Sequence, residues 1–401
     1  MDIKPILSSL RRGPTGAILV ALQIALALAI VVNSLFIIVQ RMEKISRDPG
    51  MDVANIFFVG FQASSDKFQG EVTIREDLGL LRSLPGVQAA TVVNAVPLSG
   101  GGSSTSMFTE PGEKGRRGDM NYFQVDEQGL ETFGARLAEG RNFDATIVTM
   151  PPKNSSTSPS GILVTRDVAK DLFPDESALG KTIYTGTSQP VTILGVIDHM
   201  HGSWPGWDKV GNVALFPVIT DETYARYMVR AKPGQRDAMM KLAEETLGKV
   251  DNGRVILRVR SLEYVAASTY AEDRAMALYL TVVIALLVGI SALGIFGLAA
   301  FNVSTRTKQI GTRRAVGARR TDILQYFLAE NWLITTVGVV LGCVLALVLG
   351  YWLSTTFELP RLKLYYLVFG VAGLWLVSLA AAFRPARRAS MVSPAIATRT
   401  V

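Results

Sequence analysis

The sequence is poor in side chains that carry chemistry, with one cysteine, Cys343, and two histidines, His199 and His201, among its 401 residues. A single cysteine excludes an intramolecular disulfide, and its place inside an apolar run makes it uninformative about the redox compartment and a poor nucleophile. Neither a Gly-x-Ser-x-Gly nucleophile turn nor a His-Glu-x-x-His metal pair occurs. The sequence therefore offers no candidate catalytic residues, and we expect a chain that is not an enzyme.

Two short patterns come close to ligand sites. Gly180-Lys181-Thr182 matches the end of a phosphate-binding loop, but that motif needs a glycine five residues earlier, where Asp175 stands and would repel phosphate. Asp198, His199 and His201 supply metal-ligand side chains, yet residues two apart share a face only in a strand, and no third cluster is evident. We interpret them as a solvated loop, and expect neither a cofactor nor a metal in this chain.

Charged side chains are missing from four long apolar runs. Hydrophobic residues make up 49% of the chain and the mean hydropathy is +0.28, which is too apolar for an ordinary soluble protein. A helix needs about 20 residues to cross the hydrocarbon core of a bilayer. The runs therefore predict membrane-spanning helices at 13–40, 276–303, 330–357 and 364–383. Ionisable groups inside spans usually mark an ion or substrate path, so their absence argues against a route through the bilayer.

Basic residues indicate how these spans are oriented. The first run follows Arg11 and Arg12 and has neither the short apolar core nor the cleavage site of a signal peptide, so we predict an uncleaved span. The stretch from Arg306 to Arg320 has no acidic residue, as expected of a cytoplasmic loop. We therefore place segments 1–12, 304–329 and 384–401 in the cytoplasm, with both termini inside. The net charge of +7 is interpreted as topology and not as a nucleic-acid surface.

Residues 41–275 read as one extracytoplasmic domain. Apolar alternation and turn residues predict two similar β–α–β halves, with strands at 56–61, 87–96, 225–230 and 255–259 and helices at 73–83 and 235–249. Strands expected at 162–165, 182–184 and 191–197 predict a β-rich insertion at about 135–212. The Gly- and Ser-rich stretch 98–118 is predicted to be a mobile loop, and 262–274 a stalk helix that continues unbroken into the second span. The predicted fold class is an α-helical membrane protein with four spans and a large α+β extracytoplasmic domain.

Small residues recur at every fourth position in the first and third spans. This spacing lets another helix approach closely where lipid gives helices no hydrophobic reason to associate. In the first span, the alternative that alanine only fills a span stays open. The predicted packing positions are Ala21, Ala25, Ala29, Gly338, Gly342 and Gly350.

The basic loop Arg306-Thr-Lys-Gln-Ile-Gly-Thr-Arg-Arg-Ala-Val-Gly-Ala318 resembles the "R-x-x-E-I-G-x-R-x-A-x-G-A" loop of the MacB/FtsX-like permease family of ABC transporters. Gln309 departs from the family's usual Glu, which puts in question an ion pair made by that position. The resemblance covers essentially the whole chain. Further similar segments are Gly134, Gly140-Arg141-Asn142-Phe143, Leu179-Gly-Lys-Thr182, Gly195 to Asp198, Pro385-Ala-Arg-Arg388 and Ser393-Pro394-Ala395.

The resemblance implies that a short helix in this loop docks on a separate pair of cytoplasmic ATPase subunits, which hold ATP and Mg²⁺. Independently, Gly317 suits a left-handed helix end, and Thr321 or Asp322 suits the cap of the next helix. The basic residues also suit anionic lipid, and an anchor that only fixes topology is the other interpretation. The residues assigned to ATPase coupling are Arg306, Gln309, Gly311, Arg313, Arg314, Ala315, Gly317, Ala318, Arg319 and Arg320.

The resemblance also implies a second permease, in a homo- or heterodimer, and a place in the bacterial cytoplasmic (inner) membrane. The function it favours is efflux driven by motion transmitted to the extracytoplasmic domain, with a periplasmic adaptor and an outer-membrane duct as further partners. Lipoprotein release, or the passing of a signal to an envelope enzyme without transport, are the alternatives.

Overall fold

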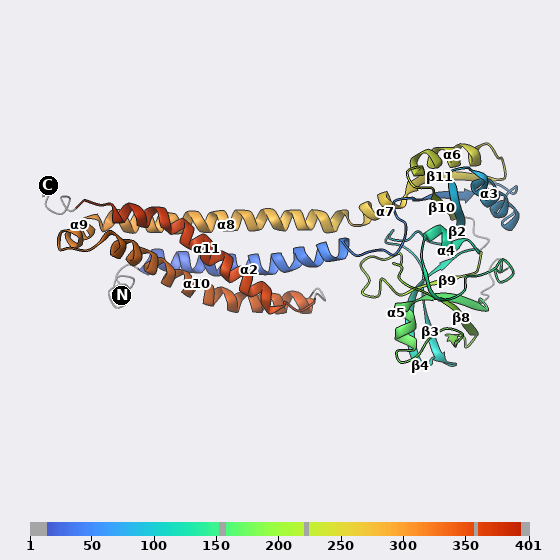
Figure 1. The fold of residues 1–401 in the computed structure, drawn as a ribbon, viewed down its shortest axis with the longest axis horizontal. Coiled ribbons are helices and arrows are strands. Elements are labelled where there is room, and N and C mark those ends of the chain that lie inside the picture. The colour runs from blue at the N-terminus through green and yellow to red at the C-terminus, as the bar shows by residue number, and fades with distance from the viewer. Residues whose placement is uncertain (1–13, 152–157, 220–223, 357–359, 394–401) are drawn as a thin grey trace. The chain divides into compact units, whose positions relative to one another are not determined.

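A computed structural model describes residues 14–151, 158–219, 224–356 and 360–393 (Figure 1). The chain divides into two units, one formed by residues 1–43 and 273–401 and the other by residues 44–272. The expected cytoplasmic N-terminus at 1–12 and residues 394–401 of the expected tail lie outside the described residues. The first unit holds the predicted spans, and the second holds the predicted α+β domain.

The described residues of the first unit form four long helices and one short one. They are α2 (Pro14–Ile45), α8 (Ala271–Thr305), α9 (Thr307–Ala315), α10 (Arg320–Thr356) and α11 (Leu364–Ser390). All but α9 are long and apolar enough to cross a membrane, so the four predicted spans are confirmed as candidate spans. The helix α2 is the most buried of the four, because α8, α10 and α11 each present a glycine to it, at Gly294, Gly342 and Gly370.

The small residues of α2 and α10 allow these two helices to approach closely. A Cβ added at Gly342 would lie 2.9 Å from Leu28 Cβ and 3.0 Å from the carbonyl oxygen of Ala25, so a side chain at this position has no room. The alanine stripe of α2 therefore lines a helix contact and does not merely fill a span. The buried members of this seam are Ala21, Ala25, Ala29, Gly338, Gly342 and Gly350.

Polar side chains fasten the same bundle. The Asn33 side-chain amide donates to the carbonyl oxygen of Ala346 at 3.1 Å, joining α2 to α10. Asn331 on α10 donates to Ser378 Oγ on α11 at 2.8 Å, and Thr335 Oγ1 lies 2.5 Å from the same oxygen. Interhelical hydrogen bonds of this kind contribute about 0.6 kcal/mol each on average.

The second unit contains a four-stranded sheet built from two β–α–β halves, which confirms the predicted pair. The first half is β1 (Ile56–Ala63), α3 (Glu71–Ser83) and β2 (Val87–Val93), and the second is β10 (Tyr224–Ala231), α6 (Arg236–Gly248) and β11 (Arg254–Ser261). The strand order is β11-β1-β10-β2, with every neighbouring pair antiparallel. This is the split arrangement in which each half inserts a strand beside the other.

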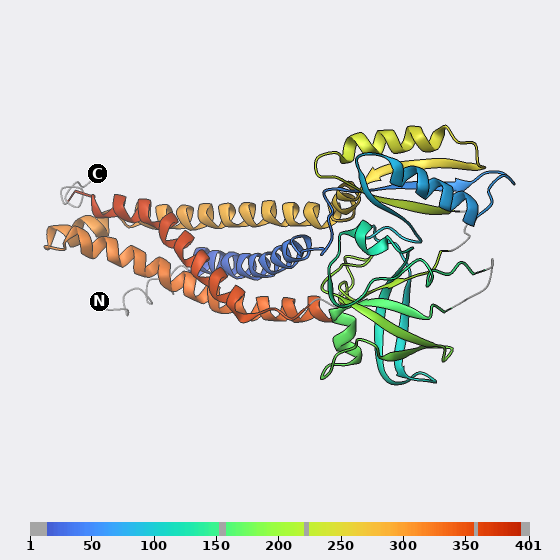
Figure 2. The same ribbon diagram turned by 45° about the vertical axis from the view of Figure 1, so that its right-hand side comes forward.

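The helices α3 and α6 cover one face of this sheet (Figure 2). Alternation of side chains along β1 sends Phe57, Val59 and Phe61 toward these helices, whereas Phe58 points to the opposite face. Under the helices, a buried ion pair joins Asp77 on α3 to Arg254 on β11, and the Tyr227 hydroxyl donates to the same carboxylate at 2.8 Å. Burial and this carboxylate raise the pKa of Tyr227 well above its usual value.

The part of the chain between β2 and β10 forms a second sheet, and its described residues contribute seven strands. Its strands are β3 (Ser104–Glu110), β4 (Lys114–Gln124), β5 (Leu137–Gly140), β6 (Gly161–Thr165), β7 (Thr182–Thr185), β8 (Pro190–Ile197) and β9 (Val213–Phe216). The order is β5-β8-β6-β9-β4-β3-β7, and β7 also pairs with β8. The sheet therefore closes on itself as a small barrel, with the helix α5 (Arg166–Leu172) packed against its core.

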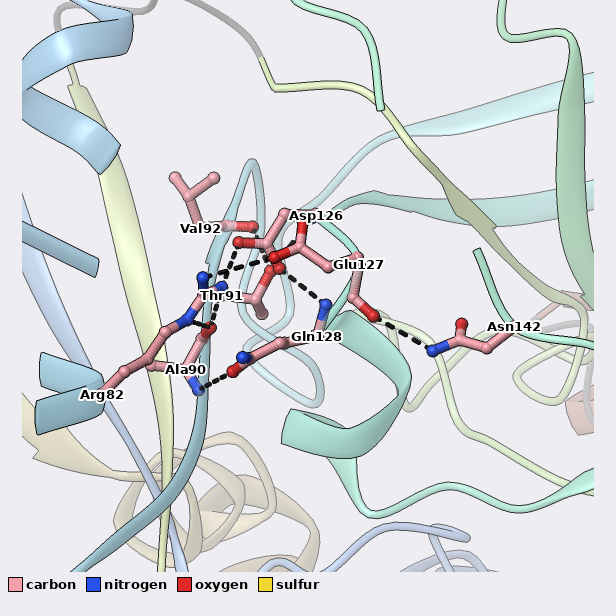
Figure 3. A network of polar contacts seen from close by, with 8 residues as sticks. All are labelled: Arg82, Ala90, Thr91, Val92, Asp126, Glu127, Gln128 and Asn142. Carbon is pink, nitrogen blue, oxygen red and sulfur yellow. Dashed lines mark hydrogen bonds and ion pairs between the residues drawn. The ribbon is translucent and has the colours of Figure 1, made fainter. Parts of the chain in front are cut away.

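Two helices and an ion-pair network connect the sheets. The helices are α4 (Gly129–Phe133), which ends at left-handed Gly134 with φ +67°, and α7 (Leu262–Thr269). In Figure 3, Arg82 of α3 reaches both Asp126 and Glu127 and also donates to the Ala90 carbonyl oxygen at 2.7 Å. Burial raises the pKa of Asp126, while the Arg82 charge opposes that rise. The network therefore ties the α3–β2 half to the segment that leads out of the barrel.

Three expectations for this unit need correction. The stretch 98–118 is no loop, because β3 and the first part of β4 lie in it. The second sheet consequently begins at 104 and ends at 216, beyond the expected insertion at 135–212. The stalk helix is not continuous, because α7 ends at Thr269 and α8 begins at Ala271. Tyr270, between them, is 7% exposed, and no glycine or proline marks the break.

Candidate coupling site at α9

The site begins with the turn that ends α9. Gly317 has φ +106°, a conformation that glycine adopts without steric cost. Its amide donates to the Arg314 carbonyl oxygen at 3.2 Å, and the Ala318 amide donates to the Arg313 carbonyl oxygen at 3.0 Å. These two bonds are those of a Schellman motif. The left-handed helix end that the sequence predicted at Gly317 is therefore present.

The next helix, α10, is capped from inside its first turn. The Asp322 carboxylate accepts a hydrogen bond from the Arg319 amide at 2.9 Å, which satisfies a donor that the helix leaves without an intrahelical partner. Of the two expected capping residues, Asp322 thus has the role. Together with the Schellman motif, this cap fixes both sides of the turn between α9 and α10.

An apolar cluster holds α9 against α10 and α11. Ile310 is 3% exposed and packs with Ile323 and Phe327 of α10 and with Ala386 and Ala389 at the end of α11. One side of the short helix is therefore buried, so its orientation about its own axis is fixed. Ile310 was outside the predicted site, although its place as an isolated apolar residue in a basic segment could have indicated an anchor.

An ion pair provides a second anchor. Arg306 Nη1 donates to both carboxylate oxygens of Glu330, at 3.1 and 3.0 Å, and the Glu330 side chain is 3% exposed. The guanidinium of Arg306 is thus committed to α10, although the sequence assigns Arg306 to ATPase coupling. The sequence predicts Glu330 only as the first residue of the third span, but α10 already begins at Arg320. A lone acidic residue at the edge of an apolar run was the signal for this partner.

The remaining predicted coupling residues divide by burial. Gly311 is buried, and Arg314 and Ala318 are partly buried, whereas Gln309, Arg313, Ala315, Gly317, Arg319 and Arg320 are exposed. The Arg313 guanidinium lies 5.0 Å from the centre of the Tyr326 ring, a cation–π contact that restrains it. Val316 is 84% exposed at the tip of the turn. We call the exposed set Lys308, Gln309, Thr312, Arg313 and Val316 the α9 outer face.

The two near-miss motifs occupy other places. Lys181 Nζ lies 2.9 Å from a carboxylate oxygen of Glu176, so its charge is engaged locally. The rings of His199 and His201 lie 4.9 Å apart, edge to face, and His199 Nε2 is 2.8 Å from the carbonyl oxygen of Asp48. His201 is 3% exposed and therefore buried, whereas we expected a solvated loop there. Neither motif lies in the unit that contains α9.

Models of known families match most of the chain. One described as a MacB-like periplasmic core domain matches residues 17–246, and one described as an FtsX-like permease C-terminal region matches residues 281–394. Curated relatives include proteins named macrolide export ATP-binding/permease protein MacB. That of Chromobacterium violaceum is 26% identical over 275 residues, covering 65% of this chain and 40% of the relative. That of Bradyrhizobium diazoefficiens is 28% identical over 299 residues, covering 70% and 42%. The chain spans about two fifths of the length of these relatives.

Two solved structures are similar at lower identity. The periplasmic region of MacB from Actinobacillus actinomycetemcomitans is 14% identical, with 56% of this chain and 97% of that one covered and a TM-score of 0.33. The extracellular domain of the ABC-type transporter YknZ from Gram-positive bacteria is 15% identical, with 50% and 100% covered and a TM-score of 0.32.

Proposed function

Because the chain belongs to the MacB/FtsX-like permease family of ABC transporters, we propose that it is a non-catalytic membrane subunit. In this role it transmits the motion of a cytoplasmic ATPase to the domain formed by residues 44–272. Its contact with that ATPase is the α9 outer face. ATP and Mg²⁺ are held by the ATPase subunits and not by this chain.

The observation that carries the proposal is the contrast between the two sides of α9. Ile310 and the Arg306–Glu330 pair hold one side, while Lys308, Arg313 and Val316 remain exposed on the other. Because α9 is fixed on one side, a displacement of α9 by the ATPase moves α10 and α11 with it, and α9 does not rotate about its own axis. An outer face with basic side chains around an apolar tip suits an acidic cleft with an apolar floor on the ATPase.

The orientation in the membrane follows from the positive-inside rule. Basic residues cluster on α9, on the turn after it and at the end of α11, and these segments lie on the cytoplasmic side of a bacterial inner membrane, with both termini. Residues 44–272 lie on the other side. The basic residues that support this orientation are Lys308, Arg313, Arg314, Arg319, Arg320, Arg384, Arg387 and Arg388.

The activity that this motion drives on the extracytoplasmic side is efflux. Two permeases pair, and a periplasmic adaptor with an outer-membrane duct receives the substrate. The names of the curated relatives, which are called macrolide export proteins, support this choice. Release of lipoproteins and signalling to an envelope enzyme are the outcomes that partner identification separates from efflux.

The test is mild-detergent purification of the tagged chain from its own cells, with identification of every protein that comes along. We expect an ABC ATPase to co-purify with the wild type and to be lost with the Lys308→Glu/Arg313→Glu variant. The matched control is Arg384→Glu/Arg387→Glu, which makes the same change of charge on exposed residues of α11 and should retain the ATPase. Equal retention by both variants would reject the docking role of α9.

The same purification distinguishes efflux from lipoprotein release and from signalling. A co-purified periplasmic adaptor supports efflux. A lipoprotein carrier or a cell-wall hydrolase in its place would contradict it and favour one of the other two functions.

A further inference from the structure

The face of the first sheet that α3 and α6 leave uncovered contains a hollow of about 210 Å³ beside α7. Three arginines line it: Arg226 on β10, and Arg258 and Arg260 on β11. The buried side chains of Phe58 and Val96 supply an apolar wall. Figure 1 shows α7 at the end of β11, and side chains of α7, among them Tyr264 and Ser268, line the hollow. Three positive charges thus converge on one concave surface of the domain.

The hollow exists because the middle strand has no side chain there. Gly60 of β1 pairs in register with Arg226 on one side and with Arg258 on the other. The backbones of β10 and β11 are therefore separated by roughly 9–10 Å at this level, twice the spacing of neighbouring strands. A Cβ at Gly60 would meet no atom closer than 3.4 Å, and φ is not positive there. Neither backbone conformation nor crowding requires glycine, but a larger side chain would occupy the space between the two arginines.

These arginines have no acidic partner in the part of the chain that the structure describes. Among the described residues, no carboxylate lies within ion-pair distance of Arg226, Arg258 or Arg260. Glu263, the acidic residue next to the hollow on α7, is instead paired with Arg236 at 2.8 Å. Most of the guanidinium N–H groups are therefore uncommitted within the described ranges, where no carboxylate offsets their attraction for an anion.

Aromatic rings hold two of the guanidiniums in place. Arg226 lies 4.6 Å from the centre of the Tyr224 ring, and Arg260 lies 4.7 Å from that of Tyr264. Arg226 also donates to the Asn94 carbonyl oxygen at 2.6 Å. Because restrained side chains lose less conformational freedom on binding, these contacts prepare the site for a ligand. The serine and threonine hydroxyl groups in the lining already donate to backbone carbonyl oxygens, as Ser268 does to Tyr264 at 2.9 Å, so the arginines are the principal charged donors.

We propose that this hollow binds a phosphate-bearing anion. The planar N–H pairs of arginine match the spacing of phosphate oxygens, and three guanidiniums suit a ligand with more than one negative charge. The volume is below the range of about 300–1,000 Å³ typical of drug-sized ligands, which favours a small anion or a headgroup over a bulky efflux substrate. The phosphate comes either from a soluble molecule or from a phospholipid, since Ser268 and Thr269 lie only a few residues before the apolar run of α8.

The test uses the full chain, with inorganic pyrophosphate as the soluble probe and nanodiscs containing phosphatidylglycerol as the lipid probe. Calorimetry in detergent measures the first, and backbone hydrogen exchange of peptides covering β11 and α7 measures the second. Two variants address the site: Arg258→Gln/Arg260→Gln removes charge, and Gly60→Leu fills the floor while all three arginines remain. The control is Lys114→Gln/Arg116→Gln, which removes the same charge from exposed residues of β4. Gly60→Ala, which has room for its Cβ, checks that a side chain at this position permits folding.

We expect saturable pyrophosphate binding that weakens at least tenfold in both site variants and is unchanged in the control, if the source is soluble. If the source is lipid, protection of β11 and α7 appears only in phosphatidylglycerol nanodiscs and disappears in both site variants. Binding that survives in Gly60→Leu, or that falls equally in the control, would show diffuse electrostatic attraction and overturn the proposal. Absence of both responses, or binding to an acidic peptide alone, would also overturn it.

Discussion

The guanidinium of Arg306 and the carboxylate of Glu330 form a two-oxygen ion pair, with N–O distances of 3.1 and 3.0 Å, between the start of α9 and the first third of α10. The Glu330 side chain is 3% exposed and that of Arg306 is 22% exposed. Removing one partner of a buried pair leaves an uncompensated charge and costs about 3–5 kcal/mol. We expect Arg306→Met to lower the thermal midpoint of the detergent-solubilised protein markedly, and Glu330→Gln to lower it less, because Arg306 is nearer to solvent.

The control for this pair is Arg320→Met, which removes an exposed charge a few residues before Asp322 and should leave the midpoint nearly unchanged. The double variant Arg306→Met/Glu330→Gln should be more stable than Arg306→Met alone. If the two single effects simply add, the residues are not coupled and the pair is no anchor.

Substitution of Gly317 tests whether the turn presents α9 to its partner. No atom lies within 4 Å of a Cβ built at Gly317, so alanine there meets only the backbone strain of a positive φ, about 1–2 kcal/mol. Gly317→Ala should weaken co-purification of the ATPase, and Gly317→Pro, which also removes the amide that donates to Arg314, should abolish it. Membrane insertion should be normal in both variants. Gly297→Ala, also in open space, is the control, and full ATPase retention by Gly317→Pro would refute the prediction.

Substitution of Gly342 tests the contact between α2 and α10. A Cβ at this position would lie 3.0 Å from the backbone oxygen of Ala25, so Gly342→Leu must push the helices apart. Overpacking of this kind typically costs about 1–3 kcal/mol, and we expect a lower thermal midpoint in detergent. Gly373→Leu places the same side chain at an exposed position on α11 with no atom within 4 Å. Equal midpoints for the two variants would show that the seam carries no packing constraint.

Burial makes His201 a source of pH dependence. Desolvation, with the neighbouring His199 and Arg47 charges, lowers the pKa of His201 to about 4 from 6.5. Between these values the unfolded chain binds more protons than the folded one, so stability falls as the pH decreases through this window. From pH 7.5 to pH 5 the loss is about 2 kcal/mol, or roughly 4–8 °C in the midpoint of the unit containing His201.

The variant His201→Phe should remove that part of the pH dependence, because phenylalanine does not titrate. The Nδ1 atom of His201 has no hydrogen-bond partner among the described residues, so the substitution breaks no hydrogen bond at that atom. His199→Gln, which keeps His201, should retain that part of the pH dependence. The measurement is the thermal midpoint of each protein at the two pH values. An unchanged slope in His201→Phe would assign the effect to other groups.

The parts of the fold that follow periodic patterns were predictable. Uncharged runs gave the four helices, and alternation gave both β–α–β halves, because each depends on residues close in sequence. The end of β4 was predicted, as a strand at 122–125. The strand β3 and the first part of β4 were missed because their exposed positions carry Ser, Lys, Arg and Gly, and only a few residues, such as Met107 and Met120, point into the barrel. From composition alone, such strands are predicted to be loops.

The site was predictable only in part, for a similar reason. Gly317 and the exposed basic residues could be located from their own segment. The partner of Arg306 could not, since Glu330 lies 24 residues further on and its role depends on how α8 and α10 turn toward each other. The break at Tyr270 also left no trace in the sequence, because no helix-breaking residue accompanies it.

The closing of the barrel by β7 has a consequence for how copies of this chain meet. Strands with an unpaired edge can recruit a strand from another molecule and lead to swapping or aggregation. Here β7 is paired on both sides, by β3 and β8, and the edge left open in the described sheet belongs to β5, which is four residues long and ends at Gly140. The barrel therefore offers a neighbouring molecule little backbone to invade, and the longer open edges in the described domain are those of the first sheet, at β11 and β2.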